Sequence, residues 1–254
     1  MGTRRGGRHP HRGYPVKKPR RKGIGMADNT TPRIRVSKDG PYLLDHSVPV
    51  EKQSIVVDEA GESVAWETVE SLPQRAPCAL CRCGSSSVKP YCDGTHHTIG
   101  FDGTETASRA PYEDAAHALT GPVLVLMDEK ELCAEARFCS AKGTAWHRVE
   151  NGDQESCDVV IEEAGLCPSG RYTAVDAESG QVHEPPLDPS IALIEDPSQG
   201  VSGPLWVRGG IHVESAEGTA YPVRNRVTLC RCGGSKNKPF CDATHVDIGF
   251  SDAE

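Results

Sequence analysis

Six cysteines and three histidines fall in a stretch that occurs twice in the chain. Residues 81–101 read CRCGSSSVKPYCDGTHHTIGF, and residues 230–250 read CRCGGSKNKPFCDATHVDIGF. Both copies have Cys-x-Cys, eight residues, Cys, three residues, His. Thiolates and imidazoles are soft ligands, so this repeated spacing predicts two metal sites. The candidate ligands are Cys81, Cys83, Cys92 and His96 in the first copy, and Cys230, Cys232, Cys241 and His245 in the second.

The spacing also indicates how four ligands could converge. In an extended Cys-x-Cys segment both cysteine side chains point to the same side, so Cys81 and Cys83 can bind one metal. Cys92 and His96 are four residues apart, which is one turn of a helix if Asp93 is its N-cap. A zinc ion with three cysteines and one histidine is the alternative, although Cys-x-Cys is tighter than the usual zinc spacing.

Both stretches resemble the CDGSH (NEET-type) iron–sulfur motif, C-x-C-x2-[S/T]-x3-P-x-C-D-G-[S/A/T]-H. The resemblance implies a [2Fe–2S] cluster on three cysteines and one histidine in each copy. The second copy has Ala243 where the family has glycine, and alanine suits the first turn of a helix. The matching residues are Cys81, Cys83, Ser86, Pro90, Cys92, Asp93, Gly94, Thr95 and His96, then Cys230, Cys232, Ser235, Pro239, Cys241, Asp242, Thr244 and His245.

Histidine ligation has a chemical consequence for these clusters. Imidazole binds iron only when it is neutral, so protons compete with the metal at mildly acid pH. Replacing one thiolate by a neutral ligand also makes a cluster less negative and easier to reduce. We therefore expect both clusters to be acid-labile and their reduction potentials to depend on pH.

A third group of cysteines lies between the two copies. Cys133, Cys139 and the Cys167-Pro sequence resemble the divergent single-cluster 4Fe–4S domain that often accompanies CDGSH motifs in bacterial proteins. Such domains offer a histidine two residues after the first cysteine, where this chain has Glu135. Cys157 is the available fourth cysteine. The resemblance implies a third cluster, [4Fe–4S] with a fourth ligand or [3Fe–4S] without one; an open iron site is the alternative.

Short alternating runs predict the strands that must position these ligands, and the repeat extends into them. The Gly40-Pro41 pair precedes Val48-Pro-Val50 by eight residues, just as Gly203-Pro204 precedes Ile211-His-Val213. Residues 158–164 predict a short helix ending at Gly165, and the proline-rich residues 184–204 predict an extended surface connector. The expected strands are 33–36, 42–44, 54–57, 63–66 and 121–126.

The sequence thus predicts an α+β, β-rich fold. Two homologous CDGSH modules would form an internal pseudo-dimer, with a small ferredoxin-like cluster segment between them. The expected domains are a disordered basic tail (1–32, with Met26 as a possible true start), the first module (33–107), the 4Fe–4S-type segment (108–180), and the connector with the second module (181–254).

Composition narrows the classes of function. A hydrophobic fraction of 37% is thin for one large core and suits small modules stabilised by metal. Eleven cysteines without a secretory segment favour metal binding over disulfides. Residues 1–25 hold nine of the 28 basic residues and no acid, which leaves 19 bases against 36 acids. The folded body is therefore not expected to bind nucleic acid.

No dinucleotide loop, P-loop or nucleophile elbow is present, and no apolar run is long enough to span a bilayer. The sequence predicts a cytoplasmic monomer, not bound to membranes, with an internal pseudo-two-fold axis. It would transfer electrons to a redox partner or deliver clusters or iron to an apo-acceptor protein. A redox or iron sensor, an oxidoreductase with an open iron at the middle cluster, and a structural zinc protein are the alternatives.

Overall fold

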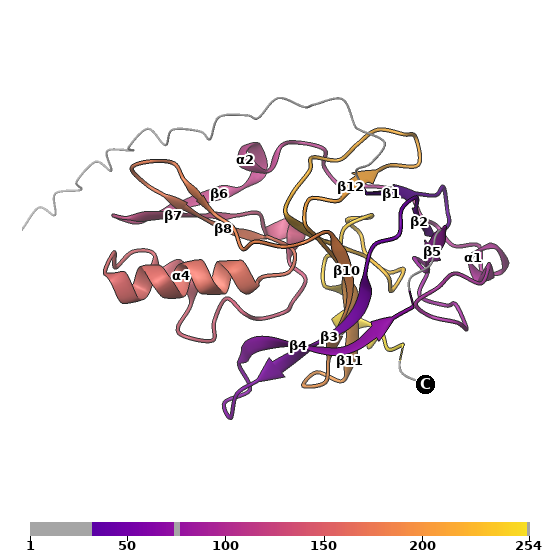
Figure 1. Cartoon of the computed structure of the whole chain (residues 1–254), viewed down its shortest axis with the longest axis horizontal. Helices are drawn as coiled ribbons and strands as arrows, with labels where there is room; N and C mark the ends of the chain where they lie inside the picture. The colour runs from indigo at the N-terminus through magenta and orange to yellow at the C-terminus, as the bar shows by residue number, and fades with distance from the viewer. Residues whose placement is uncertain (1–31, 74–76, 253–254) are drawn as a thin grey trace, which may run out of the picture.

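Strands dominate the computed structural model, which describes residues 32–73 and 77–252 (Figure 1). The described residues form thirteen strands in three sheets, five α-helices and one 3-10 helix. This confirms the β-rich fold expected from the sequence. The basic tail predicted over residues 1–32 lies, except for its last residue, outside the described part of the chain.

Two of the sheets carry the repeated stretches, and the third belongs to the middle segment. The first sheet, in the order β12-β1-β2-β5, contains β1 (Arg33–Val36), β2 (Tyr42–Leu44), β5 (Cys78–Leu80) and β12 (His212–Glu214). The second, in the order β13-β11-β10-β3-β4, contains β3 (Val50–Val57), β4 (Ser63–Leu72), β10 (Ser190–Asp196), β11 (Val201–Arg208) and β13 (Arg226–Leu229). The third, in the order β6-β7-β8-β9, contains β6 (His117–Thr120), β7 (Leu124–Asp128), β8 (Tyr172–Asp176) and β9 (Val182–His183).

The helices are short, with one exception. The longest, α4, lies beside the third sheet in Figure 1 and packs against β8. The helices are α1 (Thr95–Thr98), α2 (Tyr112–Ala115), α3 (Ala145–Arg148), α4 (Gln154–Leu166) and α5 (Thr244–Asp247), with the 3-10 helix η1 at Lys130–Leu132.

Each half of the repeat places strands in the sheet of the other half. β12, from the second half, runs parallel to β1, with Arg33 opposite His212. The hairpin of β3 and β4, from the first half, extends the second sheet, with β3 parallel to β10 and Val50 opposite Ile191. The remaining pairings are antiparallel in both sheets: β1 with β2, β2 with β5, β3 with β4, β10 with β11, and β11 with β13. Neither half completes its sheet alone, so the repeat folds as one interlocked unit.

One apolar core joins these two sheets. Ile34 and Leu80 from the first half and Ile191, Leu193 and Leu229 from the second are fully buried in the same cluster. Full burial of one such side chain stabilises a fold by about 1.5–3 kcal/mol. The shared core explains why the exchanged strands stay in the opposite sheet.

The surface connector expected over residues 184–204 is wrong. This stretch contains all of β10 and the first half of β11, and Ile191 through Ile194 are buried. Its prolines lie outside the regular hydrogen bonds between β10 and β11. Pro189 precedes β10, Pro197 follows it, and Pro204 lies beside a register shift near Leu193. A proline there removes no needed hydrogen bond, so proline content did not indicate a surface position.

The expected helix in the middle segment is real but longer. α4 begins four residues earlier than predicted, because the Asp153 carboxylate accepts a hydrogen bond from the Ser156 N–H at 2.9 Å and caps it. The strand expected over 121–126 begins at Leu124 instead, since the Gly121 N–H bonds to the Leu124 carbonyl in a turn. The strands expected over 54–57 and 63–66 are the ends of the longer β3 and β4.

Candidate metal centres

Each repeated stretch brings its four donors together as two pairs. Cys81 Sγ lies 3.7 Å from Cys83 Sγ, and Cys92 Sγ lies 3.4 Å from His96 Nδ1. The second copy repeats both separations, at 3.7 and 3.4 Å. Two thiolates on one tetrahedral metal at about 2.3 Å lie about 3.8 Å apart, and a thiolate and an imidazole nitrogen about 3.5 Å. Each pair therefore has the separation of two donors on one metal.

The donors of each repeated site form two pairs and no larger group. In residues 32–73 and 77–252, no three Cys, His, Asp or Glu side chains are grouped so that they could hold one metal ion. A zinc site with three cysteines and one histidine would need four donors around one point. Donors in two pairs fit two metals instead, one bound by two thiolates and the other by a thiolate and an imidazole.

The turn before the histidine forms the Cys–His pair. α1 begins after Gly94, which has φ 90°, so Asp93 is not the N-cap that the spacing predicted. The Asp93 carboxylate instead accepts hydrogen bonds from the backbone N–H groups of Ser87 and Thr95, at 2.8 and 2.9 Å. These bonds, that of Ser87 first, lower the pKa of Asp93 and close the ligand loop.

Ala243 takes the place of that glycine in the second copy, with φ 69° ahead of α5. The expectation that Ala243 lies in the first turn of a helix is therefore wrong. A left-handed conformation costs a non-glycine residue about 1–2 kcal/mol. We expect Ala243→Gly to relieve this strain. The free energy of unfolding should rise by only about 1 kcal/mol, because the extra freedom of glycine in the unfolded chain offsets part of the gain.

Denaturant unfolding of the metal-free protein measures this effect. Gly94→Ala is the mirror-image control, because a Cβ at Gly94 meets no atom within 4 Å and only the strain changes. The Gly94→Ala substitution should lower the free energy of unfolding by a similar amount. Equal stability of Ala243→Gly and the wild type would contradict the strain.

The two ligand loops touch each other through their second cysteines. Cys83 and Cys232 form an antiparallel bridge, which holds their Cα atoms about 4.5–5.5 Å apart. The next residues, Gly84 and Gly233, have φ of 77° and 81°. A Cβ at either glycine would lie 2.5 Å from the carbonyl oxygen of the opposite cysteine. The two sites are thus direct neighbours.

The second site is the more deeply buried. Cys230 and Cys241 are almost inaccessible, whereas Cys92 is partly exposed. Burial, and then the Arg231 cation, lower the pKa of His245 to about 4. Burial also lowers the pKa of His96. Both imidazoles are therefore neutral at pH 7, which is the form that binds a metal.

The low pKa of His245 makes the metal-free protein sensitive to acid. An unfolded histidine has a pKa of about 6.5. Between pH 6.5 and 4 the unfolded chain binds more protons than the folded one, so stability is complete above pH 6.5 and is lost as the pH falls. A shift from 6.5 to about 4 corresponds to about 3 kcal/mol.

Denaturant unfolding at pH 7 and pH 4.5 tests this expectation. Protonation of carboxylates also destabilises the fold over this range, so the wild type is compared with His245→Asn. Between pH 7 and pH 4.5 the free energy of unfolding of this variant should fall by about 3 kcal/mol less than that of the wild type. His96→Asn, at the shallower site, is the control and should change the loss less. Parallel losses in the wild type and His245→Asn would contradict the assignment.

Three cysteines of the middle segment lie near one another. Burial raises the pKa of Cys139 to about 12, and the neighbouring thiolates of Cys167 and Cys133 add to the shift. Cys133 follows η1 and Cys167 follows α4. Burial raises the pKa of Cys133, and the charge of Arg171, which pairs with Asp128 at 2.7 Å, opposes this shift. Half-buried thiols beside a fixed cation could hold a cluster, whose ligands must be thiolates.

The structure does not bring Cys157 to this group. Cys157 lies ten residues before Cys167 along α4, a distance of about 15 Å at 1.5 Å per residue, and it packs in a core with Leu126 and Val160. Glu135 is closer, with its carboxylate 3.7 Å from Cys133 Sγ. The signal that could have indicated Glu135 as a candidate was its place at the histidine position of the resembled family.

Two arginines of the second half hold the Cys167 loop. Arg226 in β13 is almost completely buried and pairs with Glu184 at 3.0 Å. Arg224 donates to the carbonyl groups that follow Cys167. Arg226 donates to the carbonyls of Ala164, Gly165, Cys167 and Tyr172. The strand that leads to Cys230 therefore also positions the middle cysteines, a link that sequence patterns did not indicate.

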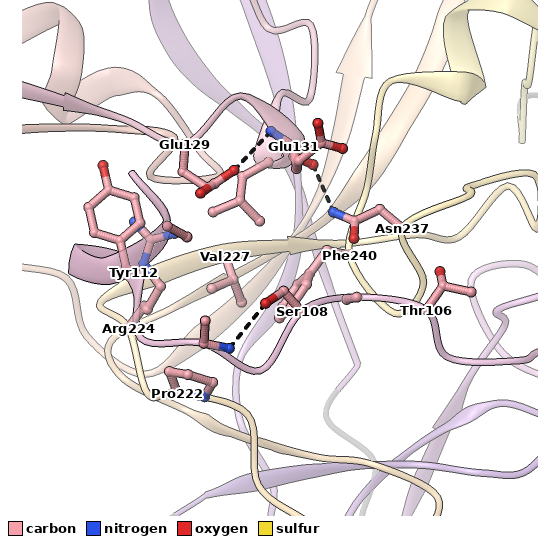
Figure 2. Close-up of a pocket in the computed structure, with 14 residues that line it drawn as sticks. Thr106, Ser108, Tyr112, Glu129, Glu131, Pro222, Arg224, Val227, Asn237 and Phe240 are labelled. Atoms are coloured by element: carbon pink, nitrogen blue, oxygen red, sulfur yellow. Dashed lines mark hydrogen bonds between the residues drawn. The ribbon is translucent and has the colours of Figure 1, made fainter. Parts of the chain in front are cut away.

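A cavity of about 400 Å³ is lined by residues 106–132 and by the second half of the repeat (Figure 2). Phe240 and Val227 line it, as does Leu132, and the Asn237 side chain donates to the Glu131 carbonyl at 2.8 Å. Phe240 directly precedes Cys241, and Leu132 directly precedes Cys133. The cavity is thus lined by a chain neighbour of one cysteine from each group.

Comparison with known proteins identifies the repeated stretches. Residues 39–97 and 202–246 match the family described as iron-binding zinc finger CDGSH type. Each match spans one complete set of three cysteines and one histidine. No curated protein and no solved structure matches the chain. Among the described residues, no helix has both the length and the apolarity that crossing a membrane requires.

Proposed function

We propose that this CDGSH iron-binding domain protein holds one [2Fe–2S] cluster at each repeated site and transfers electrons, or delivers clusters or iron, to protein partners. The observation that carries the proposal is the pairing of donors at 3.7 and 3.4 Å in both sites. In each site the Cys-x-Cys thiolates would bind one iron, and the Cys–His pair the other. The cluster supplies reversible one-electron chemistry when bound.

The two sites would act as an internal pseudo-dimer within a monomer. Two observations support this arrangement. Strands of each half lie in the sheet of the other, β12 in the first sheet and β3 with β4 in the second, and Cys83 contacts Cys232. A third cluster, [3Fe–4S] or [4Fe–4S], would bind Cys133, Cys139 and Cys167, whose thiols are near one another. The redox partner or apo-acceptor would be a cytoplasmic protein.

Iron and sulfide counts, with EPR of the reduced protein, test the proposal. Two [2Fe–2S] clusters and one cubane-type cluster require seven or eight irons per chain, whereas the zinc alternative gives a colourless protein without acid-labile sulfide. Reversible reduction without loss of iron favours electron transfer. Stoichiometric transfer of iron and sulfide to an apo-acceptor favours delivery. A change in partner affinity on cluster loss would favour the sensor.

Histidine ligation gives a separate expected result. At pH 5.5 the wild-type clusters should lose their visible absorption, and the double variant His96→Cys, His245→Cys should retain it, because thiolates replace the imidazoles that compete for protons. The reduction potentials of the double variant should also lose their pH dependence. Unchanged acid lability would sink the assignment of the histidines as ligands.

The cavity favours a second candidate function, an oxidoreductase in which the middle site reduces a small molecule. Leu132 and Phe240 in its walls are the chain neighbours of Cys133 and Cys241, so a molecule in it would contact the residue next to one cysteine of each group. Ala107→Trp would fill the cavity from one wall. If the protein reduces a small quinone, this variant should lose that activity and keep its iron content; retained activity would exclude the cavity as the site.

A further inference from the structure

Each ligand pair of cysteines encloses a buried arginine. Arg82, between Cys81 and Cys83, is 1% exposed, and Arg231, at the same place in the second copy, is 4% exposed. In an extended Cys-x-Cys the middle side chain points away from the two cysteines. Both guanidinium groups therefore lie in the protein interior, directly behind their metal site. Their surroundings differ.

The guanidinium of Arg231 lies beside two carboxylates. Its guanidinium pairs with Glu195 at 2.8 Å and with Asp252, and it also donates to the carbonyls of Ile194 and Gly203 at 2.9 and 2.6 Å. With both carboxylates ionised, the group behind the second site carries a net charge of −1. Burial raises the pKa of Glu195, so this charge is complete only well above the usual pKa of a glutamate. The Ser202 hydroxyl hydrogen-bonds to both carboxylates and helps to hold them in place.

Arg82 has no such partner among the described residues. It donates only to the backbone carbonyls of Ser37 and Gly103, at 3.3 and 2.6 Å. The rings of Tyr42 and Phe101 lie 5.6 and 5.7 Å from its guanidinium carbon, and its Nε is buried without a hydrogen-bond partner. No described carboxylate therefore pairs directly with Arg82 behind the first site. The nearest acid with a resolved effect is Asp102, whose pKa is lowered first by hydrogen bonds from Thr104 and then by the Lys238 and Arg82 charges.

A single position in the repeat accounts for much of this difference. Asp252 stands two residues after Phe250, and the residue two after Phe101 is Gly103. The carboxylate of the second copy is thus replaced by a backbone carbonyl in the first. A Cβ at Gly103 would lie 2.6 Å from an Arg82 nitrogen, so the guanidinium occupies the space that the aspartate side chain would need.

We infer that the two clusters have different reduction potentials and that the first site, at Cys81–His96, accepts an electron first. This inference rests on the proposed function. Reduction adds one electron to a cluster, and no bond forms or breaks. The added negative charge is stabilised by the Arg82 cation and opposed by the carboxylates around Arg231. The partial exposure of Cys92 acts in the same direction, because water stabilises the reduced cluster.

Lys238 does not reverse this order, because it lies between the sites. Its charge lowers the pKa of Cys230, after the hydrogen bond from Cys232 and two backbone hydrogen bonds. Its ammonium also lies 6.0 Å from the Phe101 ring of the first half. One cation near both sites raises both potentials and leaves the difference to the arginine partners.

An EPR-monitored redox titration of the full chain tests the inference. The wild type should show two separate one-electron steps for its [2Fe–2S] clusters. His245→Cys alters the EPR spectrum of the second site and should move only the lower step. Glu195→Gln with Asp252→Asn removes two charges at nearly constant volume, so the lower step should rise toward the upper one. Arg82→Gln should lower the upper step.

The controls separate the possible failures. Asp45→Asn removes an exposed carboxylate that pairs with Arg35 and should move neither step. A single step for both clusters, a lower step at the first site, or unchanged steps in the Glu195→Gln, Asp252→Asn variant would overturn the inference. Absence of any [2Fe–2S] signal would overturn the proposed function and this inference together. If Arg82→Gln does not fold, the carboxylate variant still decides.

Discussion

Replacing Arg226 by methionine should lower the free energy of unfolding by about 3–5 kcal/mol, the range for breaking a buried, hydrogen-bonded charge pair. Arg226 satisfies the carbonyls at the end of α4 and that of Cys167. Its loss leaves these acceptors, and the Glu184 carboxylate, without their donor. Because Cys167 lies in the freed loop, the proposed third cluster should be lost, while the two proposed [2Fe–2S] clusters should remain.

Denaturant unfolding and iron counts on the reconstituted protein measure the two effects. Arg208→Met is the matched control, because Arg208 lies directly opposite Arg226 in the neighbouring strand of the same sheet and its ion pair is with Glu51, at 2.6 Å, not with the Cys167 loop. The Arg208→Met variant should lower the free energy of unfolding by about 1 kcal/mol, as the loss of a partly exposed ion pair does. It should keep its full iron content. Equal loss of iron from all three sites in Arg226→Met would contradict a local role.

Gly84→Ala should cost about 3 kcal/mol or more and lower the occupancy of both [2Fe–2S] sites. The left-handed conformation accounts for about 1–2 kcal/mol. The new Cβ, 2.5 Å from the Cys232 carbonyl oxygen, would also force two backbone segments apart, which adds about 1–3 kcal/mol. Since that carbonyl belongs to a ligand of the second site, a change in the first loop disturbs both.

Gly218→Ala isolates the effect of the clash. Gly218 has φ 80°, close to the 77° of Gly84, and a Cβ there meets no atom within 4 Å. It should cost only about 1–2 kcal/mol, and both clusters should stay. Gly233→Ala, on the other side of the contact, should reproduce Gly84→Ala. Loss of the first cluster alone in either variant would show that the two loops are not coupled.

The donor pairs of the repeated stretch could be predicted because their spacing is local. Cys81 through His96 span sixteen residues, and the turn and short helix that pair their donors are encoded within that span. The strands 33–36 and 42–44 were likewise readable, since each alternates over a few residues. The error at Ala243 was also local: its residue type indicated helix, and the turn required a left-handed residue.

Predictions from the sequence failed where the structure depends on contacts between residues far apart in the chain. Proline content indicated a surface connector over 184–204, but its buried strands depend on β3, which lies more than 130 residues earlier. Cys157 satisfied the count of four cysteines, but a continuous helix separates it from Cys167. Spacing along the chain carries no information on such distances.

The sequence by itself determined the ligand types, their number and their repetition, because these are properties of short segments. Tertiary structure decided how the sites relate. The Tyr42 hydroxyl, for example, donates to the Cys230 carbonyl at 2.7 Å across 188 residues. Three further contacts likewise join residues from separate segments. They are the bridge between Cys83 and Cys232, the ion pairs of Arg231 with its carboxylates, and the hydrogen bonds of Arg226 to the Cys167 loop. Only the packed fold brings such charges and carbonyls together, and burial gives them their strength.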